Sequence, residues 1–260
     1  MALSGCTPQS SSGVMDVATG TATSSGTITV NGTTIIKTGS PFFGSVLYVP
    51  NDGKPHPGVL LLHGSEGGSA PYTDYSAAYL ASQGYAALSF CYFKCTGKVP
   101  VQPGADGSLE TAQSMPAELV NVDLGRTYKA MTWLRHSDWV ANGKVSLLGF
   151  SRGAEQSLVF ASYLASRPTV DHPDAVMVHA PYPDVVGGLP AAADDPNCWN
   201  DGNPENGDPS NWKASCGPYP FGQNGPVAWT WNDPTNGPLT PKTGELTPGT
   251  PITTFSISAG

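Results

Sequence analysis

Ser151 is the side chain of this sequence best placed to act as a nucleophile. It stands in Gly149-Phe150-Ser151-Arg152-Gly153, between the apolar run 145–148 and a stretch, 154–164, with apolar residues at helical spacing. The pattern predicts a buried strand, a sharp turn at the serine and a helix, a setting that presents a serine hydroxyl to a carbonyl carbon. Glycines at 149 and 153 would let strand and helix pass closely, because neither has a side chain. The alternative is a serine that only caps the helix.

A second glycine-rich segment, His63-Gly64-Ser65-Glu66-Gly67-Gly68, follows the apolar run 58–62, which is typical of a central strand covered on both faces. The segment lacks the G-x-G-x-x-G spacing of a dinucleotide-binding turn and the Gly-Lys-Ser/Thr ending of a phosphate-binding loop. Its backbone N–H groups are suited to stabilise a negatively charged oxygen in a transition state. A glycine loop without any ligand is the alternative.

Strands and helices alternate along the chain. The Asn31-Gly32 step predicts a hairpin, and Gly84 predicts the end of a helix. The expected strands are 26–30, 33–36, 42–49, 58–62, 85–90, 145–148, 175–180 and 252–258, and the expected helices are 72–82, 154–164 and a long one from Pro116 to Leu134. This order predicts an α/β fold with a mostly parallel central sheet and helices on both faces. Ligands bind such sheets at the carboxyl ends of the strands, where both glycine-rich segments would lie.

The composition indicates one large domain, residues 26–260, in a protein that does not bind nucleic acid. The 260 residues suffice for a sizeable core. The formal net charge is −8 with only 12 Lys+Arg, and no basic run is present, which also disfavours binding to anionic membrane surfaces through charge.

The N-terminus resembles a bacterial lipobox. Leu3-Ser4-Gly5-Cys6 is followed by a Ser-, Thr- and Gly-rich stretch, so residues 1–25 are expected to be a tether. Met1-Ala2 is too short for a signal peptide, so we expect the start to be clipped. The parent protein would then be a lipoprotein of the bacterial cell envelope, anchored through lipidated Cys6, or a secreted protein. The alternative is a coincidental cysteine in a disordered tail.

The remaining four cysteines predict two local disulfides, Cys91 with Cys95 and Cys198 with Cys216, although other pairings are open. No second correctly spaced Cys or His pair is present, which disfavours zinc. Residues 187–251, rich in Pro, Gly, Asn and Asp, predict a lid or pocket wall. Its tryptophans either line an apolar acyl pocket or pin the segment to the core. The Asn/Asp run 194–208 hints at calcium, but Trp199 interrupts the ligand spacing of an EF-hand loop, so no metal is expected.

With both glycine-rich segments in place, the chain resembles the α/β-hydrolase superfamily. The closest likeness is to the dienelactone-hydrolase-like group and to the catalytic domain of acyl-CoA thioester hydrolases and bile-acid-CoA:amino-acid acyltransferases. The residues that carry it are 64–68, Leu80-Ala81-Ser82-Gln83-Gly84-Tyr85-Ala86, Tyr92-Phe93 and 149–155.

The resemblance implies a serine hydrolase without cofactor that acts on carboxyl esters or thioesters. Ser151 would form an acyl-enzyme that water then hydrolyses. The N–H groups of Arg152 and Ser65, or alternatively Glu66, would form the oxyanion hole. A small-molecule ester or thioester is the implied partner.

The resemblance also implies an acid and a histidine after the strand 252–258. All five histidines precede that position. Asp184 is an alternative acid, whereas His179 is expected to lie in or at the end of a strand and to pack in the core. We therefore expect that the parent protein extends beyond both ends of this chain, and that the last strand and helix of the fold are lacking. The alternative is a non-catalytic binding module of the cell envelope on a hydrolase fold.

Overall fold

The computed structural model describes residues 26–68, 70–96, 110, 115–165, 170–181, 188, 195–204, 209–217, 227–231 and 250–251. The expected tether 1–25, the expected strand 252–258 and much of 187–251 lie outside the described residues.

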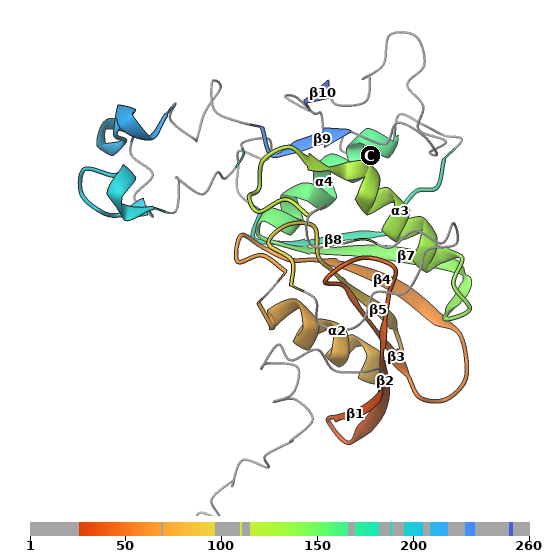
Figure 1. Ribbon diagram of the computed structural model, residues 1–260. Coiled ribbons are helices and arrows are strands. Elements are labelled where there is room, and N and C mark those ends of the chain that lie inside the picture. The colour runs from red at the N-terminus through yellow and green to blue at the C-terminus, as the bar shows by residue number, and fades with distance from the viewer. Residues whose placement is uncertain are drawn as a thin grey trace, which may run out of the picture.

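The centre of the fold is a seven-stranded sheet with the order β1-β2-β3-β5-β4-β7-β8 (Figure 1). Its strands are β1 (Gly26–Val30), β2 (Thr33–Gly39), β3 (Val46–Pro50), β4 (His56–Leu62), β5 (Ala86–Phe90), β7 (Val140–Phe150) and β8 (Val176–His179). The four adjacent strands β5, β4, β7 and β8 are parallel, whereas β1, β2 and β3 join them through antiparallel pairings. The expected α/β class with a mainly parallel sheet is confirmed.

The first hairpin forms as the sequence predicts. Val30 pairs with Thr33, so Asn31 and Gly32 make a two-residue connection in which both residues have positive φ, 49° and 78°. Positive φ at both positions is the geometry that favours Asn-Gly, because it matches the twist of the two strands.

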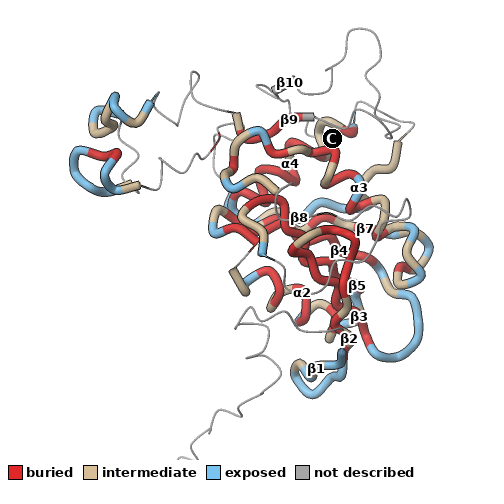
Figure 2. Tube along the Cα trace, viewed as in Figure 1, coloured by how far each residue is buried: buried red, intermediate tan, exposed pale blue. Residues whose placement is uncertain are grey.

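Three helices cover the sheet. Helix α2 (Tyr72–Ser82) lies on one face, and α3 (Leu124–Arg135) and α4 (Arg152–Ala165) lie on the other (Figure 1). Alternate residues of β4 supply the two cores: Leu60 and Leu62 face α3 and α4, and Val59 and Leu61 face α2. Figure 2 shows buried residues running through the sheet, with exposed residues at the β1–β2 tip. The apolar run 58–62 is therefore a central strand buried on both faces, as expected.

Three expected boundaries are wrong. The strand predicted at 145–148 extends over Val140–Phe150 as β7, because it pairs with β4 from His56 to Leu62. The strand predicted at 42–49 begins only at Val46, because residues 42–45 form a turn in which the Ser45 N–H donates to the Phe42 carbonyl at 3.0 Å. The helix predicted from Pro116 begins at Leu124, because the Asp123 carboxylate accepts from the Gly125 N–H at 2.8 Å and caps the helix there.

The residues just before α3 join a small second sheet instead. Its order is β10-β9-β6, with β6 at Val122–Asp123, β9 at Trp229–Trp231 and β10 at Thr250–Pro251. Trp229 is fully buried in the main core beside Tyr92, with ring centroids 6.0 Å apart. For Trp229, the expected alternative of pinning the late segment to the core is therefore confirmed.

The other described part of the late segment consists of three short 3-10 helices, η3 (Pro196–Cys198), η5 (Pro209–Asn211) and η6 (Ala214–Cys216). The Cys198–Cys216 disulfide joins η3 to η6, and Trp199 is buried beside Trp212. The second disulfide joins Cys91 and Cys95, so both expected local pairings are present. Among the described residues, no helix combines the length and the apolar character needed to cross a bilayer.

Candidate active site

Ser151 occupies the turn between β7 and α4 at the carboxyl edge of the sheet. Its φ is +50°, in the left-handed region that side-chain-bearing residues rarely adopt. The Ser151 N–H donates to the His179 carbonyl at 2.9 Å, and its own carbonyl accepts from the Ala154 N–H at 2.8 Å. These bonds tie the strained residue to β8 and to the first turn of α4, while its side chain is exposed to solvent. Backbone strain held in place in this way is typical of functional residues.

The two flanking glycines lie where strand and helix touch. A Cβ atom at position 153 would overlap the Leu62 carbonyl and lie 2.5 Å from the His63 carbonyl oxygen. A Cβ atom at position 149 would overlap the Gly153 carbonyl and lie 2.5 Å from Ser157 Oγ. Both positions therefore exclude a side chain, for the steric reason that the sequence pattern suggests.

The loop after β4 lies against Ser151. A Cβ atom at Gly64 would be 3.2 Å from Ser151 Cβ. The Gly67 N–H donates to the Gly64 carbonyl at 3.2 Å, so Ser65 and Glu66 occupy the two central positions of a turn. Within the described residues, no hydrogen bond is donated by the Ser65 N–H. The structure thus brings Ser65 into the same corner as Ser151, from a strand far away in sequence.

Glu66 contributes a negative charge to this loop. Its side chain is exposed, and its carboxylate accepts from the Gly64 N–H at 2.9 Å. The motif predicts a role only for the backbone N–H of Glu66, and the sequence gives no signal for this role of the carboxylate beyond the short spacing to Gly64.

Arg152 is the first residue of α4, where backbone N–H groups have no acceptor within the helix and the helix dipole favours negative charge. Its guanidinium donates to Glu155 at 2.7 Å, and both side chains are buried beneath the turn. The backbone of Arg152 therefore follows Ser151 directly at the start of α4, and its side chain is buried away from solvent.

His63 and Tyr92 form a buried support under the loop. Their rings stack with centroids 4.1 Å apart, and the Tyr92 hydroxyl donates to the His63 carbonyl at 2.6 Å. The His63 ring uses both nitrogens, since Nδ1 contacts the Gly64 carbonyl at 2.9 Å and Nε2 accepts from the Tyr92 N–H at 3.2 Å. Burial, followed by the nearby Glu66 and Glu155 carboxylates, raises the pKa of Tyr92 well above its usual value, so its hydroxyl remains a donor. This histidine is a structural residue that the sequence analysis did not identify.

The structure does not bring a base to Ser151 within the described residues, where its hydroxyl has no hydrogen-bond partner. His179 lies at the end of β8 as expected, but the expected packing of its side chain in the core is wrong, because β8 is the last strand of the described sheet and leaves this residue exposed. Its ring is 6.2 Å from that of Phe150. Asp184, the alternative acid, lies outside the described residues.

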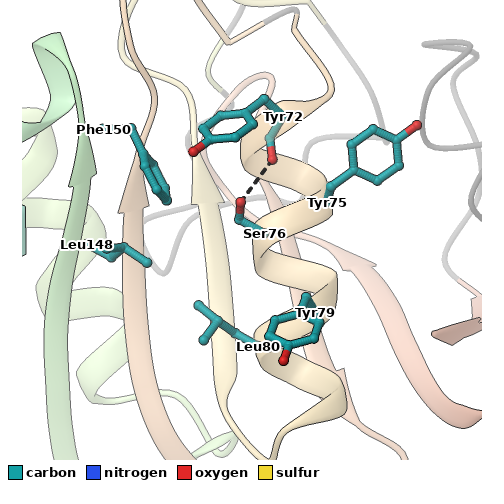
Figure 3. Close-up of a pocket in the computed structure, with 7 residues that line it drawn as sticks. All are labelled: Tyr72, Tyr75, Ser76, Tyr79, Leu80, Leu148 and Phe150. Carbon is teal, nitrogen blue, oxygen red and sulfur yellow. Dashed lines mark hydrogen bonds between the residues drawn. The ribbon is translucent and has the colours of Figure 1, made fainter. Parts of the chain in front are cut away.

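An apolar hollow of about 380 Å³ lies on the α2 face of the sheet, next to the residue that precedes Ser151. In Figure 3 the side chains of Leu148 and Phe150 on β7 face Tyr72 and Leu80 on α2. Tyr72 and Phe150 meet edge to face with centroids 4.9 Å apart. Met177, which pairs with Leu148, is 65% exposed on this face. The hollow therefore lies between α2 and β7, on the side of β7 where β8 leaves the sheet exposed.

No group of three or more His, Cys, Asp or Glu side chains suitable for a metal ion occurs among the described residues. What these residues do assemble is a strained, exposed serine beside a glycine-rich loop, at the carboxyl edge of a mainly parallel sheet. Chemically, a serine in such a setting can act as a nucleophile towards a carbonyl group.

The chain is similar in sequence to known proteins over part of its length, and in structure to solved esterases. No protein-family model matches it. Human acyl-coenzyme A thioesterase 6 is 29% identical over 120 residues, which is 46% of this chain and 24% of that protein. Rat acyl-coenzyme A amino acid N-acyltransferase 2 is 28% identical over 118 residues, which is 45% of this chain and 23% of that protein. A solved structure from a study of two fungal esterases of Rhizomucor miehei has a TM-score of 0.39 and 16% identity, and covers 67% of this chain and 50% of that one.

The two curated relatives agree with the resemblance drawn from the sequence motifs, which names acyl-CoA thioester hydrolases and acyltransferases of the α/β-hydrolase superfamily. The matched stretch spans about a quarter of the length of the curated relatives.

Proposed function

We propose that this chain carries the nucleophile of an ester or thioester hydrolase, and that Ser151 forms an acyl-enzyme. In this proposal the hydroxyl oxygen of Ser151 attacks the carbonyl carbon of the substrate, while a general base takes the hydroxyl proton and passes it to the leaving alcohol or thiol. The N–H groups of Arg152 and Ser65 stabilise the oxyanion, and expulsion of the alcohol or thiol leaves the acyl group on Ser151. Water then hydrolyses the acyl-enzyme and regenerates the serine.

The observation that carries the proposal is the backbone of Ser151. Ser151 is exposed, has positive φ and is flanked by two glycines that exclude a Cβ. This backbone conformation lowers the stability of the fold. A serine that only caps a helix adopts ordinary extended backbone and would not require it. Similarity to thioesterases supports hydrolysis of esters or thioesters in general terms.

The test is covalent labelling of the natural full-length protein with a fluorophosphonate, followed by intact mass measurement. One adduct is expected, which Ser151→Ala abolishes and Ser137→Ala, at the opposite edge of the sheet, retains. Absence of an adduct on the folded protein, or an adduct that persists in Ser151→Ala, would contradict the proposal. An unreactive, folded protein is the outcome expected of a non-catalytic binding module.

The same labelling of residues 1–260 alone locates the base. An adduct on this chain would place the base within it and make His179→Ala the next variant to test. If residues 1–260 fold but are not labelled, while the full-length protein is labelled, the base lies outside residues 1–260.

We also propose that the protein is exported and anchored through lipidated Cys6. The motif Leu3-Ser4-Gly5-Cys6 and the two disulfides support this, because disulfides persist in oxidising compartments. Metabolic labelling of the natural protein with a fatty-acid analogue should modify it, and Cys6→Ser should abolish the label. Label that is absent, or that survives this change, would refute the anchor.

A further inference from the structure

The Cys91–Cys95 disulfide lies directly beside the candidate oxyanion loop. Cys91 is the first residue after β5, and Gly64 to Gly68 follow β4, its parallel neighbour in the sheet. The two segments therefore leave the sheet side by side at the same edge. The disulfide closes a tight turn, with its cysteines four positions apart and their Cα atoms separated by 5.7 Å.

The last two glycines of the loop rest on this disulfide-closed turn. A Cβ atom at Gly68 would overlap Cys91 Sγ and lie 2.6 Å from Cys91 Cβ. A Cβ atom at Gly67 would lie 2.5 Å from Lys94 Cβ. The Gly68 N–H donates to the Phe93 carbonyl at 3.2 Å, which joins the two backbones. The last two glycines of the loop are therefore in direct packing contact with the disulfide-closed turn.

On its other side, the disulfide-closed turn packs against the body of the protein. A Cβ atom at Gly44 would lie 2.9 Å from Cys95 Cβ, so the turn before β3 packs against the second cysteine. The Cys91 N–H donates to Ser45 Oγ at 2.9 Å, and the Arg126 guanidinium donates to the Cys91 carbonyl. The disulfide is therefore clamped between the body of the sheet and the loop.

From this packing we infer that the Cys91–Cys95 disulfide is a positioning element for the oxyanion loop. It fixes Gly67 and Gly68, and through them the turn whose tip presents the Ser65 N–H beside Ser151. Oxyanion stabilisation depends on donors that are already in place, and a displacement of about 1 Å lowers rates by roughly 100-fold. The inference rests on the proposed function, because the loop has a rate to influence only if Ser151 reacts.

The test compares reaction rates per active site in the natural full-length protein and in Cys91→Ala/Cys95→Ala. A burst of 4-nitrophenol from a 4-nitrophenyl ester counts the reactive sites. The rate of fluorophosphonate modification is then divided by that count, which gives the rate per reactive site. A loss of folded molecules lowers the count, whereas a misplaced oxyanion loop lowers the rate per site. We expect a rate per site about 10- to 100-fold lower, with kcat reduced and KM little changed.

Gly68→Ala provides a second route if the cysteine variant fails to fold. It keeps both cysteines but forces the loop and the disulfide apart, and the same loss of rate per site is expected. Gly53→Ala is the matched control, because position 53 lies before β4 at the opposite edge and has open space around it. Its positive φ of 71° means that it loses stability through the backbone, without affecting the rate per site.

The positioning role would be overturned if Cys91→Ala/Cys95→Ala had an unchanged rate per site. If only Gly68→Ala folds, an unchanged rate per site in that variant would overturn it. Either result would leave Ser151 as the nucleophile. A natural protein that shows neither burst nor labelling would instead overturn the proposed function, and this inference with it.

Discussion

Replacing Gly153 by alanine tests the close crossing of strand and helix on which the turn at Ser151 depends. Gly153 lies in the first turn of α4, where an alanine would ordinarily stabilise the helix by about 1 kcal/mol. At this position, however, the new methyl group would overlap the Leu62 carbonyl and lie 2.5 Å from the His63 carbonyl oxygen. Carbon atoms pack best at about 3.5–4.0 Å, so the helix must move by about 1 Å.

The two opposing effects decide the sign of the change. The atoms in the way belong to the backbone of the central strand β4 and cannot rotate aside, so the strain should exceed the usual overpacking cost of about 1–3 kcal/mol. We expect Gly153→Ala to lower the free energy of unfolding by about 2 kcal/mol or more after the helix gain is deducted. The labelling of Ser151 should fall as well, because the turn is displaced.

Guanidinium denaturation at neutral pH measures the change, and Gly53→Ala serves as the comparison. That glycine has positive φ and open surroundings, so its replacement costs only backbone strain, about 1 kcal/mol. A Gly153→Ala protein as stable as the parent would show that strand and helix are not in contact here, and the steric account of the turn would be wrong.

Three other contacts give further expected outcomes. Partial burial raises the pKa of the Asp174 carboxyl, but hydrogen bonds, first the one from Lys144, outweigh this effect, and the pKa is lowered overall. Asp174→Asn should therefore lower the free energy of unfolding by about 0.5–1 kcal/mol at pH 7. Because the folded-state pKa is depressed, the carboxylate stabilises the fold above about pH 4, and urea titrations should show the difference vanishing as the pH falls below that value. Tyr92→Phe removes the donor to the buried His63 carbonyl and should cost about 1–2 kcal/mol in the same assay; an unchanged midpoint would refute this contact. Substituting both cysteines of the Cys198–Cys216 disulfide by serine should destabilise the segment between them by about 3 kcal/mol, seen as faster proteolysis there; equal proteolysis would contradict it.

Local patterns in the sequence predict most of the element types correctly. Asn31-Gly32 predicts the first hairpin because only a few residue pairs accept positive φ at both positions. The predicted helix 72–82 coincides with α2, and the glycine that stops it, Gly84, has a φ of +93°. In these cases the deciding interaction lies within a few residues, and a single sequence therefore contains it.

The late start of α3 also has a long-range cause. The apolar spacing from Pro116 to Leu134 fits one helix, and Leu119 and Val122 are indeed buried in the core. Val122 nevertheless extends into β6 because it pairs with Trp229, more than a hundred positions later. Pairing with a distant strand overrides local periodicity, and no pattern around Pro116 reveals that partner.

The candidate site divides in the same way. Residue types and spacing identify Ser151, its two glycines and the loop 64–68 as separate segments, because the steric demand of each turn is local. Their meeting is a matter of strand order: β4 lies between β5 and β7, which sets Gly64 beside Ser151 and Gly68 against Cys91. The stacked pair of His63 and Tyr92 beneath the loop has the same origin.

The order of elements along the chain predicts the α/β class, and short-range spacing predicts the strained serine turn and the glycine loop. Short-range spacing favours the two local disulfides but leaves other pairings open, and the structure shows that the local ones form. Only the tertiary structure decided which histidine is locked into a structural role, which carboxylate caps the loop and which disulfide supports it. These features arise where parallel strands bring distant segments to one edge of the sheet, and that arrangement is a property of the whole fold.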